Sequence, residues 1–372
     1  MVTDFFKEKK PWSKYKDFIL GYYLQPYISK LQRYGRPIAI IDCFAGPGKF
    51  QDGNDGSPLI ISKLIKDWRE KHKVNVVGVF IERKKEYYDE LEVNLSPFKG
   101  YTSPIKGEFG NYIEKIAQLS DKNTIFVYVD PFGVKDLIFD EMEKIFKKVS
   151  KNNSVELLMN FNCNGFLRWA LKALNYDSKT DEIDSDVENE EPCSIDDLNK
   201  IANGDYWQEI AISDISHEEK VENIASKYIE QLKQYFPFVN AYPIKDKLKN
   251  IPKYYLIYAT RHEDGLLLMN NTMCKAKEAF LQKEFVEGKL FDMRPDSEEK
   301  SLDLLAKHVI DVVRSKPYIL RKDIKIACIR GGLFCKYCDS DYNNTIKILT
   351  KEGKIMQTPG KIDDCTFYTE KT

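Results

Sequence analysis

Short apolar runs alternate with amphipathic stretches along the first two thirds of the chain. Runs typical of buried strands lie at 37–41, 74–82, 101–108, 124–130 and 155–161. Between or after these runs, apolar residues recur at helical spacing and predict helices at 57–71, 84–95, 110–119, 137–149, 165–174 and 217–235. Strands that are apolar throughout and alternate with helices indicate a parallel sheet covered on both faces. Two further runs, 239–244 and 254–260, flank a short Lys-rich connection and predict an antiparallel hairpin that brings the sheet to seven strands.

Both ends of the chain carry additional elements. Residues 12–31 have apolar positions at helical spacing, interrupted by Pro26, and predict a helical cover within 1–36. Beyond residue 300, helices are expected at 301–314, 321–328 and 341–349, followed by apolar runs at 354–358 and 365–369 around a Pro-Gly-Lys turn. Three helices and a two-stranded wing predict a winged helix over 300–372. The sheet domain would then span 37–290.

Composition excludes several classes of protein. The 372 residues are 42% hydrophobic, enough for a packed interior, yet no apolar stretch approaches the roughly 18 residues that span a bilayer. Charges stand where a signal peptide would be apolar, so we expect a cytoplasmic protein without a membrane association. The eight cysteines are scattered, which favours reduced thiols over a disulfide scaffold.

Charge is distributed unevenly, although the formal net charge is only -1. Lys and Arg exceed Asp and Glu by 8 to 3 over residues 1–36 and by 13 to 9 over 301–372. Residues 177–197 have one basic and ten acidic residues and predict a surface insertion within about 175–200. The basic ends suit either an ordinary solvated face or contact with an anionic partner.

A glycine loop with acidic neighbours is the first candidate site. The run 42–48 (DCFAGPG) follows the first strand directly, and its Gly46 and Gly48 would let the backbone approach a nucleotide-like cofactor at the start of the next helix. Glu82 ends the second strand, where a carboxylate can accept hydrogen bonds from a ribose diol. Glu108 ends the third strand and could face an adenine amino group, or lie exposed in solvent.

The fourth strand ends in the run 130–133 (DPFG). Asp130 and a carbonyl fixed by Pro131 can accept hydrogen bonds from an exocyclic amine, while Phe132 stacks on the ring that bears it. Methyl transfer to such an amine requires mainly alignment of the reacting atoms. The alternative is a turn in which Asp130 caps the next helix.

Taken together, these motifs resemble the three-Cys-motif partner protein family, whose members are similar to class I S-adenosylmethionine-dependent methyltransferases. The motifs that carry the resemblance are DCFAGPG at 42–48, GSP at 56–58, FIE at 80–82, DPFG at 130–133 and IYATRH at 257–262. The resemblance covers most of 10–285 and implies a Rossmann-like doubly wound sheet and a radical-enzyme-like protein partner. It also implies cofactor contacts from Asp42, Phe44, Ala45, Gly46, Gly48, Ser57, Pro58, Glu82, Glu108 and Phe109. The second proline of the amino-methyltransferase pattern is missing after Pro131.

Other polar residues are candidates for substrate binding. Lys16 could reach the mouth of the site or lie on a solvated helix face. Asn160 closes the fifth strand, and Arg168 lies on the following helix as a possible phosphate ligand, or both satisfy local backbone groups. In the winged helix, a set of polar residues could contact nucleic acid, although Asp339 and Asp341 would repel phosphate: Tyr342, Asn343, Asn344 and Lys347. The alternative is a winged helix that serves as a protein–protein adaptor.

Metal and thiol chemistry are disfavoured. Cys335 and Cys338 form a single Cys-x-x-Cys pair, but Cys328 is spaced wrongly for a second pair and no histidine is near, so we expect no metal. Cys163 lacks the companion motif of a carbon methyltransferase. His262 is expected to belong to a loop.

The sequence therefore predicts an S-adenosylmethionine-dependent methyltransferase that acts on an amino group of a nucleobase in RNA or DNA. A different class of protein stays open, namely a catalytically inactive scaffold for a three-Cys-motif partner. A methyltransferase for a small molecule or a protein is the other alternative.

Overall fold

The computed structural model of the chain describes residues 6–150, 153–176, 192–245, 252–286, 301–316, 318–360, 362–364 and 366–370. It has two compact units, Met1–Arg261 and His262–Thr372. The helices of the first unit are α1 (Pro11–Leu31), α2 (Ser57–His72), α3 (Lys85–Leu95), α4 (Ile113–Leu119), α5 (Phe139–Phe146), α6 (Cys163–Ala173), α7 (Ile195–Ala202), α8 (Trp207–Ile212) and α9 (His217–Leu232). Its strands are β1 (Ile38–Asp42), β2 (Val76–Glu82), β3 (Thr102–Lys106), β4 (Thr124–Val129), β5 (Val155–Phe161), β6 (Phe238–Lys245) and β7 (Pro252–Thr260).

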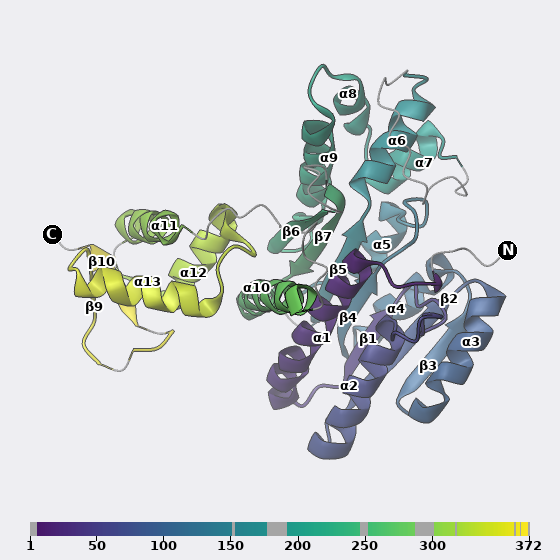
Figure 1. Cartoon of the computed structure of the whole chain (residues 1–372), viewed down its shortest axis with the longest axis horizontal. Coiled ribbons are helices and arrows are strands. Elements are labelled where there is room, and N and C mark those ends of the chain that lie inside the picture. The colour runs from purple at the N-terminus through teal and green to yellow at the C-terminus, as the bar shows by residue number, and fades with distance from the viewer. Residues whose placement is uncertain are drawn as a thin grey trace. The chain divides into compact units, whose positions relative to one another are not determined.

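The first unit is built on a seven-stranded sheet in the order β3-β2-β1-β4-β5-β7-β6 (Figure 1). Neighbouring strands from β3 to β5 pair in parallel, whereas β7 is antiparallel to both β5 and β6. The structure confirms the predicted doubly wound, mostly parallel sheet and its terminal hairpin. The strand order reverses between β1 and β4, which is where open α/β sheets bind ligands beyond the carboxyl ends of their strands.

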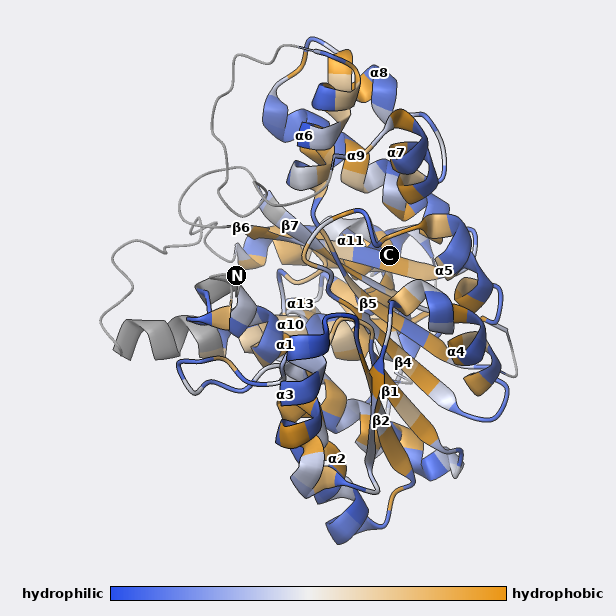
Figure 2. Cartoon of the chain, turned by 90° about the vertical axis from the view of Figure 1, so that its right-hand side faces the viewer, coloured by the Kyte–Doolittle hydropathy of each residue, from blue (hydrophilic) through white to orange (hydrophobic). Residues whose placement is uncertain are grey.

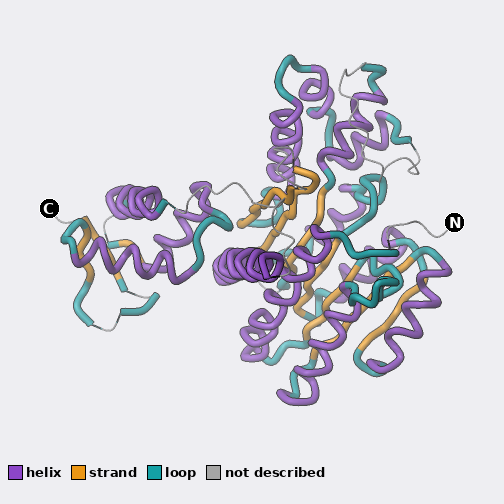
Figure 3. The backbone as a smooth tube through the Cα atoms, in the orientation of Figure 1, coloured by secondary structure: helices purple, strands orange, loops and turns teal. Residues whose placement is uncertain are grey.

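Helices cover the sheet on both faces, as the apolar strands require (Figure 3). On one face, residues of α4 to α9 pack against alternate strand positions such as Ala39 and Ile41. On the other face, α1 packs against β4, where the rings of Tyr23 and Phe126 have centroids 5.6 Å apart. Every residue of β1, β4 and β5 is buried, and these strands form the apolar centre of Figure 2.

A buried carboxylate joins α1 to the sheet. Glu156 of β5 is only 4% exposed and accepts hydrogen bonds from the hydroxyls of Tyr23, Tyr258 at 2.9 Å and Thr260 at 3.2 Å. Burial raises the pKa of Glu156. Because these partners come from α1 and β7, the network holds α1 at a fixed place over the sheet.

Three expectations about the first unit are corrected. Helix α1 continues through Pro26, because its buried residues, among them Ile19 and Ile28, hold it against the sheet on both sides of the proline. Helices α7 and α8 were not predicted. We expected an acidic surface insertion near 175–200, a range that includes most of α7. Instead, α7 is an ordered helix that begins in a capping box at Ser194 and buries Leu198 in the core. Residues 177–191 of that stretch lie outside the described chain.

The second unit contains α10 (Glu263–Val286), α11 (Leu302–Ser315), β8 (Ile319–Leu320), α12 (Arg321–Cys328), a π-helical turn (Ile329–Leu333), α13 (Asp339–Lys351), β9 (Ile355–Gln357) and β10 (Phe367–Glu370). Residues up to 286 were expected in the sheet domain, but α10 groups with this unit. Asn270 of α10 explains this, since its side chain donates to Tyr337 O and accepts from Cys335 N, both at 2.8 Å.

Three antiparallel strands in the order β8-β10-β9 complete the unit, one strand more than the predicted wing. Asn344 and Lys347 of α13 are exposed. Tyr342 is 1% exposed, so it cannot contact nucleic acid as expected. Cys365, a possible metal ligand, lies outside the described residues. Within those residues, no helix is long and apolar enough to cross a bilayer.

Candidate active site

Three acids meet at the carboxyl edge of the parallel sheet. Asp42 ends β1, Glu82 ends β2 and Asp130 follows β4. Asp42 pairs in register with Phe80 of β2 on one side and Tyr128 of β4 on the other. Because the three strands are parallel, their carboxyl ends bring the acids to one edge of the sheet, at the point where the strand order reverses.

The loop after β1 has the backbone geometry that the glycines were expected to allow. Gly46 and Gly48 have φ angles of 61° and 81°, in the left-handed region that favours glycine. Gly46 N donates to Glu82 Oε2 at 2.9 Å, and Lys84 N donates to Glu82 Oε1 at 2.7 Å. Glu82 is therefore oriented by two backbone amides, and each oxygen keeps a lone pair for a further donor.

Asp42 is the most deeply buried of the acids, with 0% exposure. Its carboxylate accepts hydrogen bonds from Ser57 Oγ at 2.7 Å and from Phe44 N at 3.2 Å. Burial raises the pKa of Asp42 to about 7, and the nearby charges of Asp130 and Glu82 raise it further, against the lowering effect of the two hydrogen bonds. In the described chain no cation pairs with Asp42, so hydrogen-bond donors alone stabilise its carboxylate.

Asp130 is held by side chains from three elements. Lys16 Nζ of α1 lies 2.7 Å from Oδ1 and 2.8 Å from Oδ2, Asn160 Nδ2 of β5 donates to Oδ1 at 2.9 Å, and Tyr128 Oη of β4 donates to Oδ2 at 2.9 Å. Each carboxylate oxygen thus accepts two hydrogen bonds. Any ligand that donates to Asp130 must displace one of these donors.

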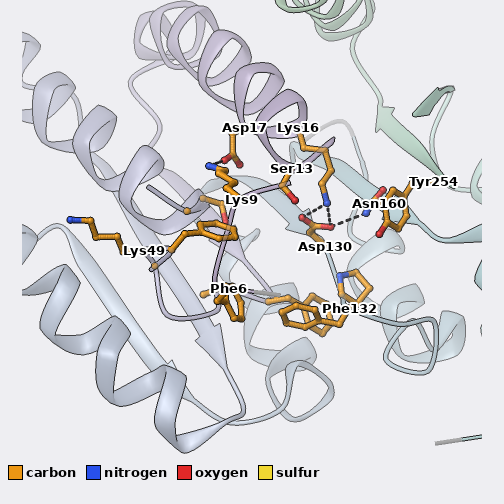
Figure 4. A pocket seen from close by; sticks show the side chains of 17 residues that line it. Phe6, Lys9, Ser13, Lys16, Asp17, Lys49, Asp130, Phe132, Asn160 and Tyr254 are labelled. Atoms are coloured by element: carbon orange, nitrogen blue, oxygen red, sulfur yellow. Dashed lines mark hydrogen bonds and ion pairs between the residues drawn. The ribbon is translucent and has the colours of Figure 1, made fainter. Parts of the chain in front are cut away.

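Asp130, Lys16 and Asn160 line one cavity (Figure 4). Its lining residues are Phe6, Lys9, Ser13, Lys16, Asp17, Phe44, Ala45, Gly48, Lys49, Phe50, Gly56, Ser57, Asp130, Pro131, Phe132, Asn160 and Tyr254. The lining combines carboxylates, lysines and aromatic rings. Phe132 is 39% exposed, and Lys84 Nζ lies 6.0 Å from the centre of its ring. An exposed ring beside a carboxylate can stack on a flat aromatic ligand.

The segment that precedes α1 lies over the glycine loop. The Phe6 carbonyl accepts from Gln51 N at 2.9 Å, and Lys9 N donates to Asp52 Oδ2 at 2.9 Å. A Cβ added at Gly46 would lie 2.8 Å from the Phe6 ring, so this ring packs directly over Gly46. Burial lowers the pKa of Lys9 to about 8, against the raising effect of Asp55 and Asp52.

The expected site residues separate into two groups. Phe44, Ala45, Gly48, Ser57, Asp130, Pro131, Phe132, Lys16 and Asn160 line the cavity. Gly46 follows the lining residue Ala45 and donates a hydrogen bond to Glu82, so both lie beside the cavity. Pro58 is buried in the first turn of α2. Glu108 is exposed beyond β3, while Phe109 is buried against Phe44 with ring centroids 5.6 Å apart. The structure does not bring Arg168 of α6 into this cavity, and Lys347 belongs to the other unit.

Several residues that line the cavity or bind Asp130 were missed. Tyr128 stands two residues before Asp130, so the two-residue period of a strand places it on the same face and could have revealed it. Tyr254, Phe6 and Lys9 left no such signal, because they reach the cavity only through long-range packing. The solvated alternative for Lys16 is wrong, since Lys16 is 6% exposed.

No cluster of three or more metal-ligating residues occurs among the described residues. Cys335 and Cys338 are buried free thiols, and burial raises the pKa of Cys328 to about 12. Cys163 is also buried, and burial raises its pKa well above the usual range, which makes it a poor nucleophile.

Comparisons with known proteins were made at the level of families, sequences and structures. No protein-family model matches the chain. No curated protein matches it. The three-Cys-motif partner assignment therefore stays a prediction.

Solved structures that resemble the chain are distant. An O-methyltransferase from Bacillus cereus in complex with SAH has 12% identity and a TM-score of 0.32, over 64% of this chain and 80% of that one. The fibrillarin pre-rRNA processing protein of Methanococcus jannaschii has 13% identity and a TM-score of 0.31, over 60% and 66%. A Legionella pneumophila protein has 9% identity and a TM-score of 0.39, over 67% and 86%. These values are low, so fold and chemistry follow here from the chain's own geometry.

We predict that Lys16 and Asp130 stabilise each other. Replacing Lys16 with Met leaves a mostly buried carboxylate without its cation, so the Lys16→Met and Asp130→Asn variants should show a coupling free energy of about 1–3 kcal/mol in a double-mutant cycle. Urea unfolding followed by tryptophan fluorescence measures it, because all four tryptophans lie in the first unit. The exposed pair Lys85–Asp89, with side chains 72% and 54% exposed, is the control and should show less than about 0.5 kcal/mol. Equal coupling for both pairs would contradict the prediction.

Asp42 should make stability depend on pH. Its folded pKa of about 7 lies above the ordinary 3.8, so the folded state binds the proton more tightly, and this stabilisation is lost as pH rises through 7. Asp42→Asn removes the buried charge. The free energy of unfolding of this variant, relative to that of the parent protein, should therefore increase from pH 5 to pH 8 and reach a difference on the order of 2–4 kcal/mol. Thermal unfolding across this range measures the difference. A difference that does not change with pH would rule out the raised pKa.

Proposed function

We propose that the chain is an S-adenosylmethionine-dependent methyltransferase that acts on an amino group of a nucleobase in RNA or DNA. The observation that carries the proposal is the convergence of Asp42, Glu82 and Asp130 with a glycine loop at the switch point of the sheet. Doubly wound sheets bind nucleotide-like ligands at this position. The acids supply the charge and the acceptors that an adenosyl group carrying a cationic centre requires.

The cofactor would be held by residues at the ends of β1 and β2. When bound, S-adenosylmethionine supplies an electrophilic methyl group on a positively charged sulfur. Glu82, oriented by two amides, would accept from the ribose hydroxyls, and the buried charge of Asp42 would be offset by the cation. Phe44, Ala45, Gly46, Gly48, Ser57 and Pro58 would surround it, with Glu108 and Phe109 towards the adenine. The ring of Phe6 would have to leave Gly46 for the backbone to be approached.

The acceptor base would bind at the end of β4. Asp130 would accept a hydrogen bond from its amine, Pro131 would fix the chain between the acid and the aromatic residue, and the exposed ring of Phe132 would stack on the base. These three residues align the amine rather than ionise it, which suits a displacement whose rate depends on geometry.

The second unit would bring the nucleic acid as a winged helix. Its order, α11-β8-α12-α13-β9-β10, supports this assignment, because a helix pair and a recognition helix precede the two strands of a wing. On α13, Asn344 and Lys347 are exposed and could contact phosphates or base edges. The side chain of Asn343, another candidate contact, donates a hydrogen bond from Nδ2 to Asp339 Oδ2 at 3.2 Å.

A scaffold that binds a three-Cys-motif partner protein is the second candidate. One observation favours it: Asp130 already accepts four hydrogen bonds and Phe6 covers Gly46, so the chain's own residues occupy both proposed ligand contacts. A scaffold would keep this arrangement, whereas an enzyme must open it.

Methyl transfer distinguishes the candidates. The protein is incubated with S-adenosylmethionine labelled in the methyl group and with total RNA, DNA and protein fractions. We expect label in the amino group of a nucleoside, and an Asp130→Ala variant should lose at least about 100-fold in rate while its affinity for the cofactor changes little. Asp136→Asn is the matched control, since Asp136 pairs with Arg83 outside the cavity.

Label found only in protein or small solutes would contradict a nucleobase acceptor. A folded protein that binds no cofactor would favour the scaffold.

A further inference from the structure

Asn160 has one hydrogen-bonding atom without a partner. The residue lies in β5, is 2% exposed and lines the cavity beside Asp130 (Figure 4). Its Nδ2 donates to Asp130 Oδ1 at 2.9 Å, but its Oδ1 has no hydrogen-bond partner in the described chain. A buried acceptor left without a donor is unfavourable, which points to a donor that arrives with a ligand.

The orientation of this amide follows from chemistry. A carboxylate only accepts hydrogen bonds, so the amide nitrogen of Asn160 must face Asp130 and the carbonyl oxygen must face away from it. Because Asn160 is in a fully buried strand, the side chain has little freedom to turn. The carbonyl oxygen is therefore a second acceptor placed next to the carboxylate.

The position of Lys16 shows that this part of the cavity accepts a nitrogen. Its ammonium group lies between both oxygens of Asp130 and is 5.3 Å from the centre of the Tyr254 ring. A carboxylate and an aromatic face together attract N–H donors. An amine that enters must take over part of this place, so Lys16 has to withdraw from Asp130.

We propose, resting on the proposed function, that Asn160 Oδ1 accepts the second N–H of the acceptor amine while Asp130 accepts the first. A primary amine has two N–H groups, and holding both leaves the direction of the nitrogen lone pair free for the methyl group. Asn160 then has the role that the sequence pattern indicated for the carbonyl of Pro131. Asn160 is thereby a specificity-determining residue for primary amines.

The consequence is a reaction that stops after one methyl group. The nitrogen forms a bond to the methyl carbon as the carbon–sulfur bond breaks, and the bonding electron pair stays on sulfur. The charged nitrogen gives one proton to Asp130, which passes it to solvent. The product keeps one N–H, so it can no longer satisfy Asp130 and Asn160 together, and a site built for two N–H groups rejects it.

The experiment compares two acceptors and two asparagines. The probes are a synthetic oligonucleotide carrying the nucleoside that takes label, and the same oligonucleotide with that nucleoside already N-monomethylated. For the parent protein we expect only the monomethyl product by mass spectrometry and a kcat/KM at least about 100-fold higher for the primary amine.

Asn160→Leu should lower kcat/KM for the primary amine by about 10- to 100-fold and reduce the ratio between the two acceptors to below about 10. Asn162→Asp is the matched control, because Asn162 caps α6 through its side-chain oxygen, which Asp retains. The control should keep the parent ratio. Fluorescence anisotropy without cofactor measures the affinity of each protein for the two oligonucleotides. The preference for the primary amine over the monomethylated amine should be smaller in Asn160→Leu than in the parent protein.

Three results would overturn the inference. The first is a parent protein that forms dimethylated product at a rate comparable to that of monomethylation, a result that can be obtained without any variant. The second is an equal loss for both acceptors in Asn160→Leu, which would mean that Asn160 is only structural. The third is an Asn160→Leu ratio identical to the parent, which would return the second acceptor role to Pro131. Absence of any transfer by the parent protein is a failure of the proposed function, and the inference fails with it.

Discussion

The candidate site depends on one constraint: the carboxyl ends of parallel strands lie at the same edge of a sheet. In this sheet β1 and β2 each end in an acid, and an acid directly follows β4. Asp42 is fully buried at this edge, and its burial, with the charges of Asp130 and Glu82, raises its pKa. Uncompensated burial of a carboxylate is unfavourable, and the fold supports it with hydrogen bonds from Ser57, Phe44 and the loop amides. A cation bound at this edge would remove the remaining cost, so the burial of Asp42 favours a cationic ligand.

Helix α1 is the second component of the site. It is fixed to the sheet by Glu156 and the tyrosines around it, and it carries Lys16 to Asp130. The segment before it places Phe6 over Gly46. The chain's own ammonium and aromatic groups therefore occupy the positions that the proposed function assigns to an amine and a cofactor, and under that proposal this segment has to open.

The strand ends could be predicted from sequence because apolar runs that stop at an acid or a glycine carry their own signal, as at Asp42 and Asp130. The helices at α7 and α8 could not, since each is short and gains its stability from burying residues such as Leu198 and Trp207 in the common core. Asn160 was a candidate for substrate binding because it closes the fifth strand, but its unpartnered oxygen depends on the register of β5 beside β4. Phe6 and Lys9 act across the fold, and no local pattern marks them.

The most direct test of this account is calorimetric titration of the protein with S-adenosylmethionine at pH 8, repeated with Glu82→Ala. The account predicts saturable binding of one cofactor, weakened at least about 10-fold when the carboxylate that would hold the ribose is removed. Folded protein that shows no binding, or equal affinity in both proteins, would contradict the claim that this acidic edge is a cofactor site.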